Sequence, residues 1–475
     1  MSLLPRSAFA SLAVPRLKER LVIVGSGWGG FSVLKRINKS KYDVTLISPS
    51  SYFNMTPLLA GTSVGTLEFR TAIESVRKFS PQSTVVEAWA DKIDFSNNTI
   101  HCTPRTHPYG TSWTLPDDPY ASTAYTSETD PTVPQASSIP SPRAPPFTIK
   151  FDKLVIAVGA HNQTFGIPGV KEYVHFLKDI RDARAIRMRI LECFTQASQP
   201  NCPEDERRKL LNFVVVGGGP TGVEFAAELH DLCTTDMRKH YPELIKFVRI
   251  TIYETGDKIL SAFDKSLAEY ASHRFAKKGI HVKKNHRVEE VKPFSLKVDK
   301  EGWVPFGMCV WSTGLAVNPL VSTLAGQLQL LVTDGHLHVL DAKTGEALSN
   351  VWAIGDAVGT VMREGRSNPV AAPLPATAQV ASQMGNYLVK TLNIGAEQTE
   401  EFKFASRGNL AYVGDGNAIY DRSMVESGPQ TKVRGRLAWL LWRSTYVSMA
   451  SPRNMLNIPW YWFTNWVFGR DLSRF

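Results

Sequence analysis

The sequence is poor in cysteine and has no long apolar run. Five cysteines stand among its 475 residues, none of them in a CxxC pair: Cys102, Cys193, Cys202, Cys233 and Cys309. This usage argues against a disulfide framework and a zinc site, predicts no metal site, and is typical of a reducing compartment. No stretch of about 18 or more consecutive apolar residues occurs, which argues against a membrane-spanning helix.

Positive charge is in excess and is concentrated near the C-terminus. The net charge is +10, an excess that suits nucleic acid, anionic lipid or an acidic cofactor. Residues 431–475 contain seven Lys or Arg and one acid, Asp471. Residues 1–18 contain three bases and no acid, which resembles an organelle-targeting peptide, although a merely disordered N-terminus has the same composition.

The chain is too long for one hydrophobic core, so two or three domains are expected. Two segments share the pattern of an apolar strand, a glycine-rich turn, an apolar-periodic helix and a second strand. In the first segment the two strands and the helix between them are expected at 20–24, 31–38 and 42–47. In the second segment they are expected at 213–216, 223–232 and 249–253. The chain therefore repeats one βαβ unit.

Both turns carry a GxGxxG motif. The first glycine permits a tight turn, the second leaves room for a pyrophosphate, and the third lets helix and strand pack closely. The N-terminus of the helix then stabilises the negative charge. The motif glycines are Gly25, Gly27 and Gly30 in the first unit and Gly217, Gly219 and Gly222 in the second. Because each turn follows a strand and opens a helix, the pair predicts two bound dinucleotides.

The residue that ends the second strand of each unit bears on nucleotide specificity. In the second unit it is Glu254, whose carboxylate can accept hydrogen bonds from an adenosine ribose and repel a 2′-phosphate, which favours NADH over NADPH. The spacing from Gly217 to Glu254 is longer than usual because a helical-looking segment, 234–246, is interposed. The first unit has Ser48 in place of an acid, which leaves its ribose contact open.

Longer motifs resemble the type II (alternative) NADH dehydrogenases, or NADH:ubiquinone oxidoreductases, over nearly the whole chain. They lie at residues 24–30, 51–59, 217–228 (GGGPTGVEFAAE), 311–314, 352–357 and 374–383 (LPATAQVASQ). Many flavoproteins share the glycine motifs, whereas 52–59 and 374–383 are far more selective. Ser48 followed by proline matches the eukaryotic, fungal-like mitochondrial members.

The resemblance implies non-covalent FAD in the first unit and NADH in the second. It places Gly355 and Asp356 at the ribityl and phosphate part of the flavin, where an aspartate can accept from a ribityl hydroxyl, and residues 56–59 along the isoalloxazine. Beyond those two residues, the turn glycines and the strand-end residues, the implied cofactor contacts are Thr56, Pro57, Leu58, Gly159, Gly314 and Ala378.

The resemblance also implies catalytic residues. Glu224 would face the nicotinamide and the flavin, and Tyr446 would lie beside the quinone. Gln379 and Gln383 are four residues apart, so they share one face of a helix, and that face would line the quinone pocket. Ser382 stands where some relatives have histidine, which argues against proton delivery by a histidine there. An ordinary solvated helix surface is the alternative for Glu224 and the two glutamines.

The C-terminal region predicts contact with a membrane surface. Five of the eleven tryptophans lie within 439–466, and residues 434–443 and 458–470 mix arginine with large apolar side chains. Tryptophan and tyrosine favour the headgroup region of a bilayer, and arginine reaches the lipid phosphates. Neither stretch is long enough to span, so the chain should lie on the membrane. A homodimer interface has a similar composition, and the two interpretations are compatible.

The predicted fold is α/β, with two Rossmann-like dinucleotide-binding domains and a C-terminal amphipathic membrane-anchoring region. Ten prolines between 104 and 146 argue against a packed element there. The expected divisions are a targeting peptide at 1–18, FAD-binding parts at 19–165 and 331–400 with an insertion at 104–148, an NADH-binding domain at 166–330, and the membrane-anchoring domain at 401–475.

The predicted activity is transfer of electrons from NADH through FAD to ubiquinone, without proton pumping. The expected location is the mitochondrial inner membrane, peripheral and on the matrix side, since no hydrophobic stop segment follows the N-terminal peptide. Ubiquinone, the membrane surface and a second copy in a homodimer are the expected partners, and nucleic acid is not expected.

Several alternatives share parts of this pattern. One is a flavin NADH reductase with another acceptor. A disulfide reductase or a sulfide:quinone oxidoreductase needs reactive cysteines, and the helix after Gly30 has none. A flavoprotein like apoptosis-inducing factor would bind nucleic acid through its positive charge, but the sequence has no recognisable nucleic-acid motif.

Overall fold

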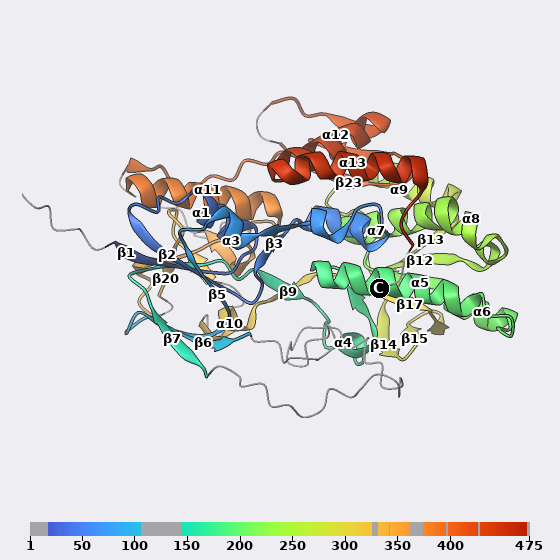
Figure 1. Cartoon of the computed structure of the whole chain (residues 1–475), viewed down its shortest axis with the longest axis horizontal. Coiled ribbons are helices and arrows are strands. Elements are labelled where there is room, and N and C mark those ends of the chain that lie inside the picture. The colour runs from blue at the N-terminus through green and yellow to red at the C-terminus, as the bar shows by residue number, and fades with distance from the viewer. Residues whose placement is uncertain are drawn as a thin grey trace, which may run out of the picture.

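The computed structural model describes residues 18–105, 145–324, 331–341, 343–361, 374–395, 398–425 and 428–472. The predicted targeting peptide and nearly all of the predicted proline-rich insertion lie outside these described residues. Figure 1 shows two α/β parts side by side, with the last two helices lying along one edge of the molecule. The domain boundaries given above stay a prediction.

The first part is built on a ten-stranded sheet with a parallel centre. Its residues 21–24 and 154–156 are almost fully buried, as expected for parallel strands covered on both faces. The central strands, in spatial order, are β21 (Ala347–Ala353), β8 (Lys153–Ile156), β1 (Glu19–Val24), β2 (Tyr42–Ser48) and β5 (Thr84–Asp94). The sheet continues on one side with β6 (Thr99–Pro104) and β7 (Phe147–Lys150) and on the other with β20 (His338–Leu340), β19 (Leu331–Thr333) and β22 (Val358–Val361).

The second part is built on a five-stranded parallel sheet. Its spatial order is β10 (His175–Phe176), β17 (Met308–Trp311), β11 (Asn212–Val216), β12 (Arg249–Glu254) and β13 (Ile280–Lys284). Its main helices are α5 (Ile180–Ala197), α6 (Glu204–Leu210), α7 (Pro220–Leu232) and α9 (Lys265–Lys277). A small antiparallel sheet adjoins it, made of β14 (Val288–Lys292), β15 (Ser295–Val298) and β16 (Gly302–Pro305).

Both predicted βαβ units are present, with shifted helix starts. The first helix, α1 (Trp28–Arg36), begins three residues before the predicted start, because Gly27 is already its N-cap. Likewise α7 begins at Pro220, a residue type that suits the first helical turn. The interposed segment is helical as predicted, but it breaks into a π-turn (Cys233–Met237), α8 (Arg238–His240) and a 3-10 turn (Pro242–Phe247).

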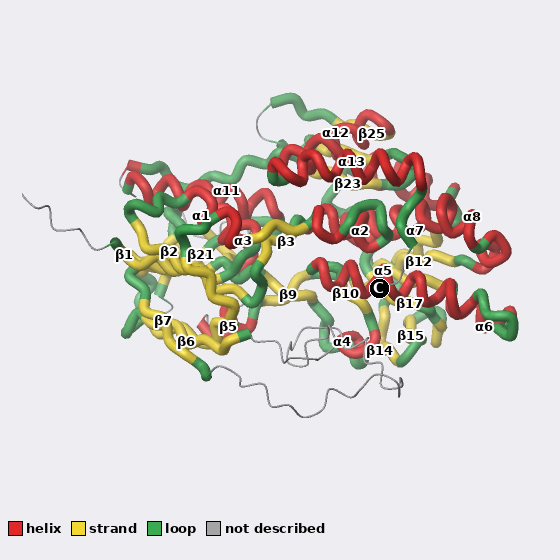
Figure 2. Tube along the Cα trace, in the orientation of Figure 1, coloured by secondary structure: helices red, strands yellow, loops and turns green. Residues whose placement is uncertain are grey.

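Short elements connect the two parts and complete the first. The antiparallel pair β9 (Ala160–Asn162) and β18 (Leu315–Val317) lies where the chain passes between the parts, as Figure 2 shows for β9. The other short elements are β3 (Tyr52–Asn54), β4 (Ile73–Ser75), 3-10 turns at Thr56–Leu58, Phe69–Thr71 and Gly355–Ala357, α2 (Leu59–Ser63), α3 (Val76–Phe79), α4 (Val170–Tyr173) and α10 (Pro319–Leu324).

Helix α11 (Ala378–Ile394) packs closely on α1. A Cβ atom on Gly385 would lie 2.8 Å from the backbone oxygen of Gly29, so glycine permits the close approach. The C-terminal region follows, with the small sheet β23 (Asn409–Tyr412), β24 (Ala418–Asp421) and β25 (Lys432–Gly435) and the helices α12 (Arg436–Met449) and α13 (Pro452–Phe468).

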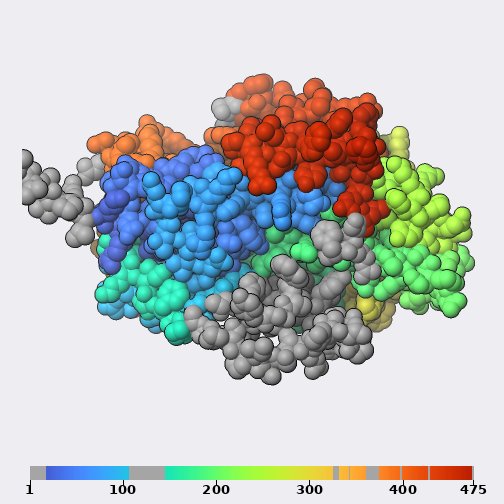
Figure 3. All heavy atoms as spheres, in the orientation of Figure 1, coloured from blue at the N-terminus to red at the C-terminus, as the bar shows by residue number. Residues whose placement is uncertain are grey.

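The outer surfaces of α12 and α13 are strongly apolar. Leu440, Trp460, Phe463 and Trp466 are all more than half exposed, and Figure 3 shows the two helices together as the red ridge of the visible face. Within the part of the chain that the structure describes, no helix is long and apolar enough to cross a membrane.

Candidate active site

The first glycine-rich turn has the geometry of a nucleotide-binding turn. Gly25 has a φ of +107°, and a Cβ atom there would lie 2.3 Å from the carbonyl oxygen of Ala157. A Cβ atom on Gly30 would lie 1.9 Å from the carbonyl oxygen of Gly25, so α1 packs directly on the turn. At Gly27 nothing lies within 4 Å of such an atom. The middle glycine therefore leaves its side of the turn open.

The second turn repeats this arrangement. Gly217 has a φ of +111°, and its Cβ would meet the carbonyl oxygen of Ser312 at 2.1 Å. The Cβ of Gly222 would lie 2.1 Å from the carbonyl oxygen of Gly217, while Gly219 is open to at least 4 Å. At both turns the first and third glycines permit a close backbone approach, and the second leaves open space.

The helices that follow the two turns begin with free amide groups. Neither α1 nor α7 has a side-chain cap or an acid in its first turn. By contrast, α5, α9 and α11 are capped by Asp179, Asp264 and Thr377. Uncapped N–H groups beside an open glycine suit a pyrophosphate. The residues of both turns therefore fit a bound dinucleotide.

A cavity of about 1340 Å³ extends from the first turn to the second part of the molecule. Thr221 at the start of α7 and residues 311–313 after β17 contribute to its wall on that side. The predicted site residues that line it are Gly25, Gly27, Ser48, Thr56, Gly159, Gly355, Asp356 and Ala378. The structure thus brings together residues that lie up to 353 positions apart in the sequence.

Eight predicted cofactor contacts do not line this cavity: Gly30, Pro57, Leu58, Gly217, Gly219, Gly222, Glu254 and Gly314. Leu58 is 1% exposed and packs in the core, because the 3-10 turn at 56–58 directs its side chain inward. Pro57, in the same turn, is also absent from the cavity wall, which Thr56 alone of the three reaches. Gly314 holds the chain between the two parts, since its carbonyl accepts a hydrogen bond of 2.9 Å from the amide of Gln163.

The two strand-end residues bind their own turns. The Ser48 hydroxyl lies 2.8 Å from that of Ser26, and it also accepts from the amide of Ser50. Glu254 ends β12 as predicted, and its carboxylate accepts from the amides of Gly218 at 2.6 Å and Gly256 at 2.7 Å. Glu254 therefore lies against the second turn, where it can meet a ribose.

Sequence reasoning missed a polar group at the start of α5. Lys178, Asp179 and Asp182 line the cavity. Burial lowers the pKa of the Lys178 ammonium, while the charges of Asp356 and Asp182 act against that shift. Burial raises the pKa of Asp356, and Lys178 opposes that shift in turn. A signal was available, because Asp179 and Asp182 have capping-box spacing and form that motif at the N-terminus of α5.

Glu224 lies where α7 meets the C-terminal region. Its carboxylate Oε1 accepts from the Tyr412 amide and from the Trp442 indole, each at 3.0 Å. It therefore faces the C-terminal region and does not line the cavity at the glycine turns. The face of α7 that carries it packs against β23 and α12. Burial raises its pKa to about 7, so this carboxyl group can hold a proton near neutral pH.

The two glutamines share one face of α11, as predicted, and clamp the chain that enters the C-terminal region. Gln379 donates to the Gly408 carbonyl at 2.7 Å and accepts from the Arg407 amide at 3.0 Å. Gln383 donates to the Ala405 carbonyl at 2.9 Å and accepts from the amide of the same residue at 3.1 Å. Both side-chain amides are thus held by backbone groups.

Tyr446 lies on α12 near Glu224. Its ring packs edge-on against Trp442, with 5.0 Å between the ring centroids. Burial and the charge of Glu224 both raise the pKa of its hydroxyl, so it is neutral and able to donate a hydrogen bond.

Comparisons with known proteins match this architecture. The family model described as "Pyridine nucleotide-disulphide oxidoreductase" covers residues 19–385, and the one described as "NDH2 C-terminal domain" covers residues 407–471. A probable NADH dehydrogenase of Dictyostelium discoideum is 35% identical, over 96% of this chain and 91% of its own length. The chain belongs to the type II NADH dehydrogenase family.

Further relatives of this family agree. The internal alternative NAD(P)H-ubiquinone oxidoreductase A1 of Arabidopsis thaliana mitochondria is 35% identical, over 96% of this chain and 86% of its own. The structure of NDH2 from Plasmodium falciparum in complex with NADH superposes with a TM-score of 0.81 and 25% identity, over 96% of this chain and all of that one.

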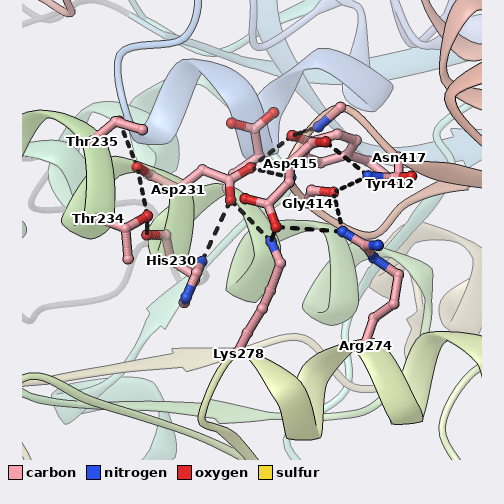
Figure 4. A network of polar contacts seen from close by, with 12 residues as sticks. His230, Asp231, Thr234, Thr235, Arg274, Lys278, Tyr412, Gly414, Asp415 and Asn417 are labelled. Carbon is pink, nitrogen blue, oxygen red and sulfur yellow. Dashed lines mark hydrogen bonds and ion pairs between the residues drawn. The ribbon is translucent and has the colours of Figure 1, made fainter.

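A partly buried polar network joins the NADH-type unit of this family member to its C-terminal region (Figure 4). Lys278, from the end of α9, lies 3.1 Å from Asp231 on α7 and 2.9 Å from Asp415. Asp231 also accepts from the Tyr412 hydroxyl at 2.7 Å. Burial raises the pKa of Asp231, but the hydrogen bond with His230 and the charge of Lys278 outweigh it and hold that pKa below its usual range.

The network includes a potential metal-ligand group, His230, Asp231 and Asp415. The Lys278 ammonium already lies against both carboxylates and supplies the compensating positive charge.

Four of the five cysteines of this family member are buried and do not suit disulfide chemistry, whereas Cys202 is partly exposed. Burial raises the pKa of the Cys102, Cys193 and Cys233 thiols to about 12, and it raises that of Cys309 as well. A thiol of raised pKa forms little thiolate, which is the reactive species. The structure therefore gives no support to the alternative of a disulfide reductase.

Proposed function

We propose that this chain oxidises NADH and passes the electrons through FAD to ubiquinone at a membrane surface. The observation that carries the proposal is the cavity that extends from the first glycine turn to the strand ends of the second unit. It supports a cofactor in the first unit within reach of a nicotinamide held by the second. Relatives named as NAD(P)H-ubiquinone oxidoreductases support the same acceptor.

The first unit would hold FAD. The amides at the start of α1 and the open side of Gly27 would bind the pyrophosphate, and Asp356 would accept from the ribityl chain. The first residues of α11 and the Lys178 ammonium would present positive potential to the polar edge of the ring system. When bound, FAD supplies acceptance of a hydride and release of electrons one or two at a time.

The second unit would hold NADH. The start of α7 and the open side of Gly219 would bind its pyrophosphate, and Glu254 would accept from its adenosine ribose. Residues 311–313 and Thr221 would guide the nicotinamide end towards the first unit, since they line the cavity on that side.

Reduction of a quinone also requires protons, and the C-terminal region offers groups that hold them. Glu224 carries a proton at neutral pH for part of the time, and the neutral hydroxyl of Tyr446 lies near it. We propose that Glu224 donates a proton towards the quinone and that the Tyr446 hydroxyl donates a hydrogen bond. The clamp formed by Gln379 and Gln383 would shape the quinone pocket by fixing residues 405–408. For either side-chain amide to contact the quinone directly, it would have to give up a hydrogen bond to the backbone of that segment.

The location and assembly form a further proposal. The exposed apolar faces of α12 and α13 support attachment to one leaflet, and a mitochondrial relative supports that organelle. We propose that the protein attaches to the matrix side of the inner membrane. We also propose that it forms a homodimer through part of the same apolar faces. Protease protection in intact mitoplasts tests the side, and the mass of the protein in detergent tests the dimer.

Nucleotide choice tests the proposal at Glu254. In Glu254→Gln the repulsion of a 2′-phosphate disappears while the shape of the side chain stays. We expect kcat/KM for NADH to fall about tenfold, for the loss of about 1.4 kcal/mol of charge-assisted hydrogen bonding, and kcat/KM for NADPH to rise. The measurement is quinone reduction with each nucleotide, together with identification of the flavin released by acid. Equal use of both nucleotides by the unmodified enzyme, or release of FMN, would contradict the proposal.

A further inference from the structure

Arg443 is held between two indole rings on the exposed C-terminal helices. The central carbon of its guanidinium lies 3.9 Å from the ring centroid of Trp439 on the same helix and 4.1 Å from that of Trp462 on α13. Cation–π contacts of this kind cover the faces of the planar cation. Its edge, which carries the N–H groups, is the part left to bind a ligand.

These N–H groups have no partner among the described residues. No hydrogen bond or ion pair joins Arg443 to that part of the chain, and its Nε is buried without an acceptor. Burial lowers the pKa of Arg443 to about 10, and the charge of Glu228 opposes that shift. Glu228, however, accepts from Thr66 at 2.6 Å and lies 3.7 Å from Arg470, so it already has a counter-charge.

The stack is partly buried against the core and lies beside exposed apolar surface on the same two helices. Leu440, Trp460, Phe463 and Trp466 expose apolar surface on the same two helices. Residues 436–468 contain three arginines and no acid. Tryptophan rings settle at the headgroup level of a bilayer, which is also the depth of the lipid phosphates. The stack would therefore place an unpaired guanidinium edge at the phosphate layer.

We propose that the Trp439–Arg443–Trp462 stack binds the phosphate of an anionic phospholipid. The planar fork of arginine matches two phosphate oxygens, and the indoles hold it in place. The anionic headgroup supplies the counter-charge that residues 436–468 lack. This inference rests on the membrane attachment proposed above and adds a defined lipid site to it.

Vesicle flotation of the full-length enzyme tests the site. The vesicles are phosphatidylcholine alone, or phosphatidylcholine with a minor share of phosphatidylglycerol. The variants are Arg443→Gln and Arg443→Lys, with Arg453→Gln as the matched control, because Arg453 is exposed on α13 and has no indole contact in the structure. Binding is measured at low and at high salt, and electron transfer from NADH to a soluble acceptor verifies that each variant is folded.

The expected results differ between substitutions at Arg443 and at Arg453. Arg453→Gln should weaken binding to the anionic vesicles about fivefold at low salt, the effect of one surface charge, and this difference should vanish at high salt. Arg443→Gln should weaken it more than about tenfold and keep a deficit at high salt, because a partly buried pair is screened less. Arg443→Lys keeps the charge but not the fork, so it should show the same high-salt deficit.

Four results would overturn the inference. Equal losses for Arg443→Gln and Arg453→Gln, both vanishing at high salt, would leave Arg443 as general surface charge. Displacement of the enzyme from the vesicles by millimolar inorganic phosphate would indicate a free-anion site. A raised KM for short-chain quinone with unchanged vesicle binding would assign Arg443 to the quinone. Failure of the unmodified enzyme to float with either vesicle would also reject the membrane attachment, whereas the first three results leave it intact.

Discussion

Within each glycine turn, glycine-to-alanine substitutions should distinguish the glycine needed for folding from the glycine needed for nucleotide binding. At Gly30 a Cβ atom would lie 1.9 Å from a carbonyl oxygen, whereas at Gly27 it would meet nothing within 4 Å. We expect Gly30→Ala to lower the free energy of unfolding by about 3 kcal/mol or more. Gly27→Ala should change it by less than about 1 kcal/mol yet weaken FAD binding at least about tenfold.

Urea unfolding of the apoprotein and fluorescence titration with FAD measure the two effects separately. The pair Gly222→Ala and Gly219→Ala provides the same comparison for NADH, because the second turn has the same geometry. Full FAD affinity in folded Gly27→Ala would show that the open side of the first turn is not where the pyrophosphate lies.

Glu224 should make stability depend on pH. Its pKa of about 7 in the folded chain lies above its ordinary value of 4.5. The stability that the neutral acid contributes is therefore present in full below about pH 4.5 and is lost as the pH rises through 7. Glu224→Gln keeps an oxygen that can accept from Tyr412 and Trp442 but cannot ionise. The variant should gain stability relative to the unmodified protein from pH 5 to pH 8, by at most about 3 kcal/mol.

Thermal unfolding across this pH range measures the effect, with the exposed Glu243→Gln as the control. A constant difference between Glu224→Gln and the unmodified protein would mean that Glu224 ionises at its ordinary pKa. A slower reaction with quinone but an unchanged reaction with a soluble acceptor would support its proposed role as a proton donor.

At the scale of single elements, local signals predicted the two βαβ units. Both βαβ units follow from an apolar strand, a glycine turn and an amphipathic helix, and their strands end within about two residues of the expected positions. The start of α1 was placed three residues too late, because an N-cap glycine carries no side-chain signal. The interposed helical segment breaks at Tyr241, before a proline that no periodicity count includes.

The clamp between α11 and residues 405–408 shows what periodicity cannot predict. The four-residue spacing placed Gln379 and Gln383 on one face, but which chain segment that face meets depends on tertiary packing. Their hydrogen bonds suggest that Gln379→Ala and Gln383→Ala will each lower stability by about 1–2 kcal/mol. Faster hydrogen exchange should appear at residues 403–410.

Hydrogen exchange measured by mass spectrometry, together with the KM for quinone, tests the role of this clamp. Asn386→Ala, at an exposed position on α11, is the control. If KM for quinone rises while the exchange of 403–410 does not change, the amides contact the quinone directly and the clamp is not their main role.

At the scale of the whole molecule, the Lys278 network should hold the C-terminal region on the NADH-type unit. Lys278→Met leaves the buried carboxylate of Asp231 without its ion-pair partner, which should cost about 3–5 kcal/mol. Lys277→Met, at an exposed neighbouring position, should cost less than about 0.5 kcal/mol. Urea unfolding measures both. Equal stability of the two variants would show that the network contributes little to that attachment.

The packing of the whole molecule brings together site residues that the sequence could not reveal. Asp231, Lys278 and Tyr412 come from three separate segments, and no motif links them. Lys178 reaches the cavity only because β10 and α5 return the chain to the first unit. The family resemblance placed Glu224 at the nicotinamide and the flavin. Its direction is set by the C-terminal region that packs on α7, which the helix sequence alone does not specify.

The central claim is that one chain passes electrons from NADH through a bound flavin to quinone. An anaerobic titration of the detergent-purified enzyme, followed by visible absorption, tests it most directly. A flavin spectrum should bleach on addition of one equivalent of NADH and return on addition of a short-chain ubiquinone, with NADPH far less effective. Bleaching without recovery would contradict the quinone half of the account, and absence of a flavin spectrum after incubation with FAD would contradict both halves.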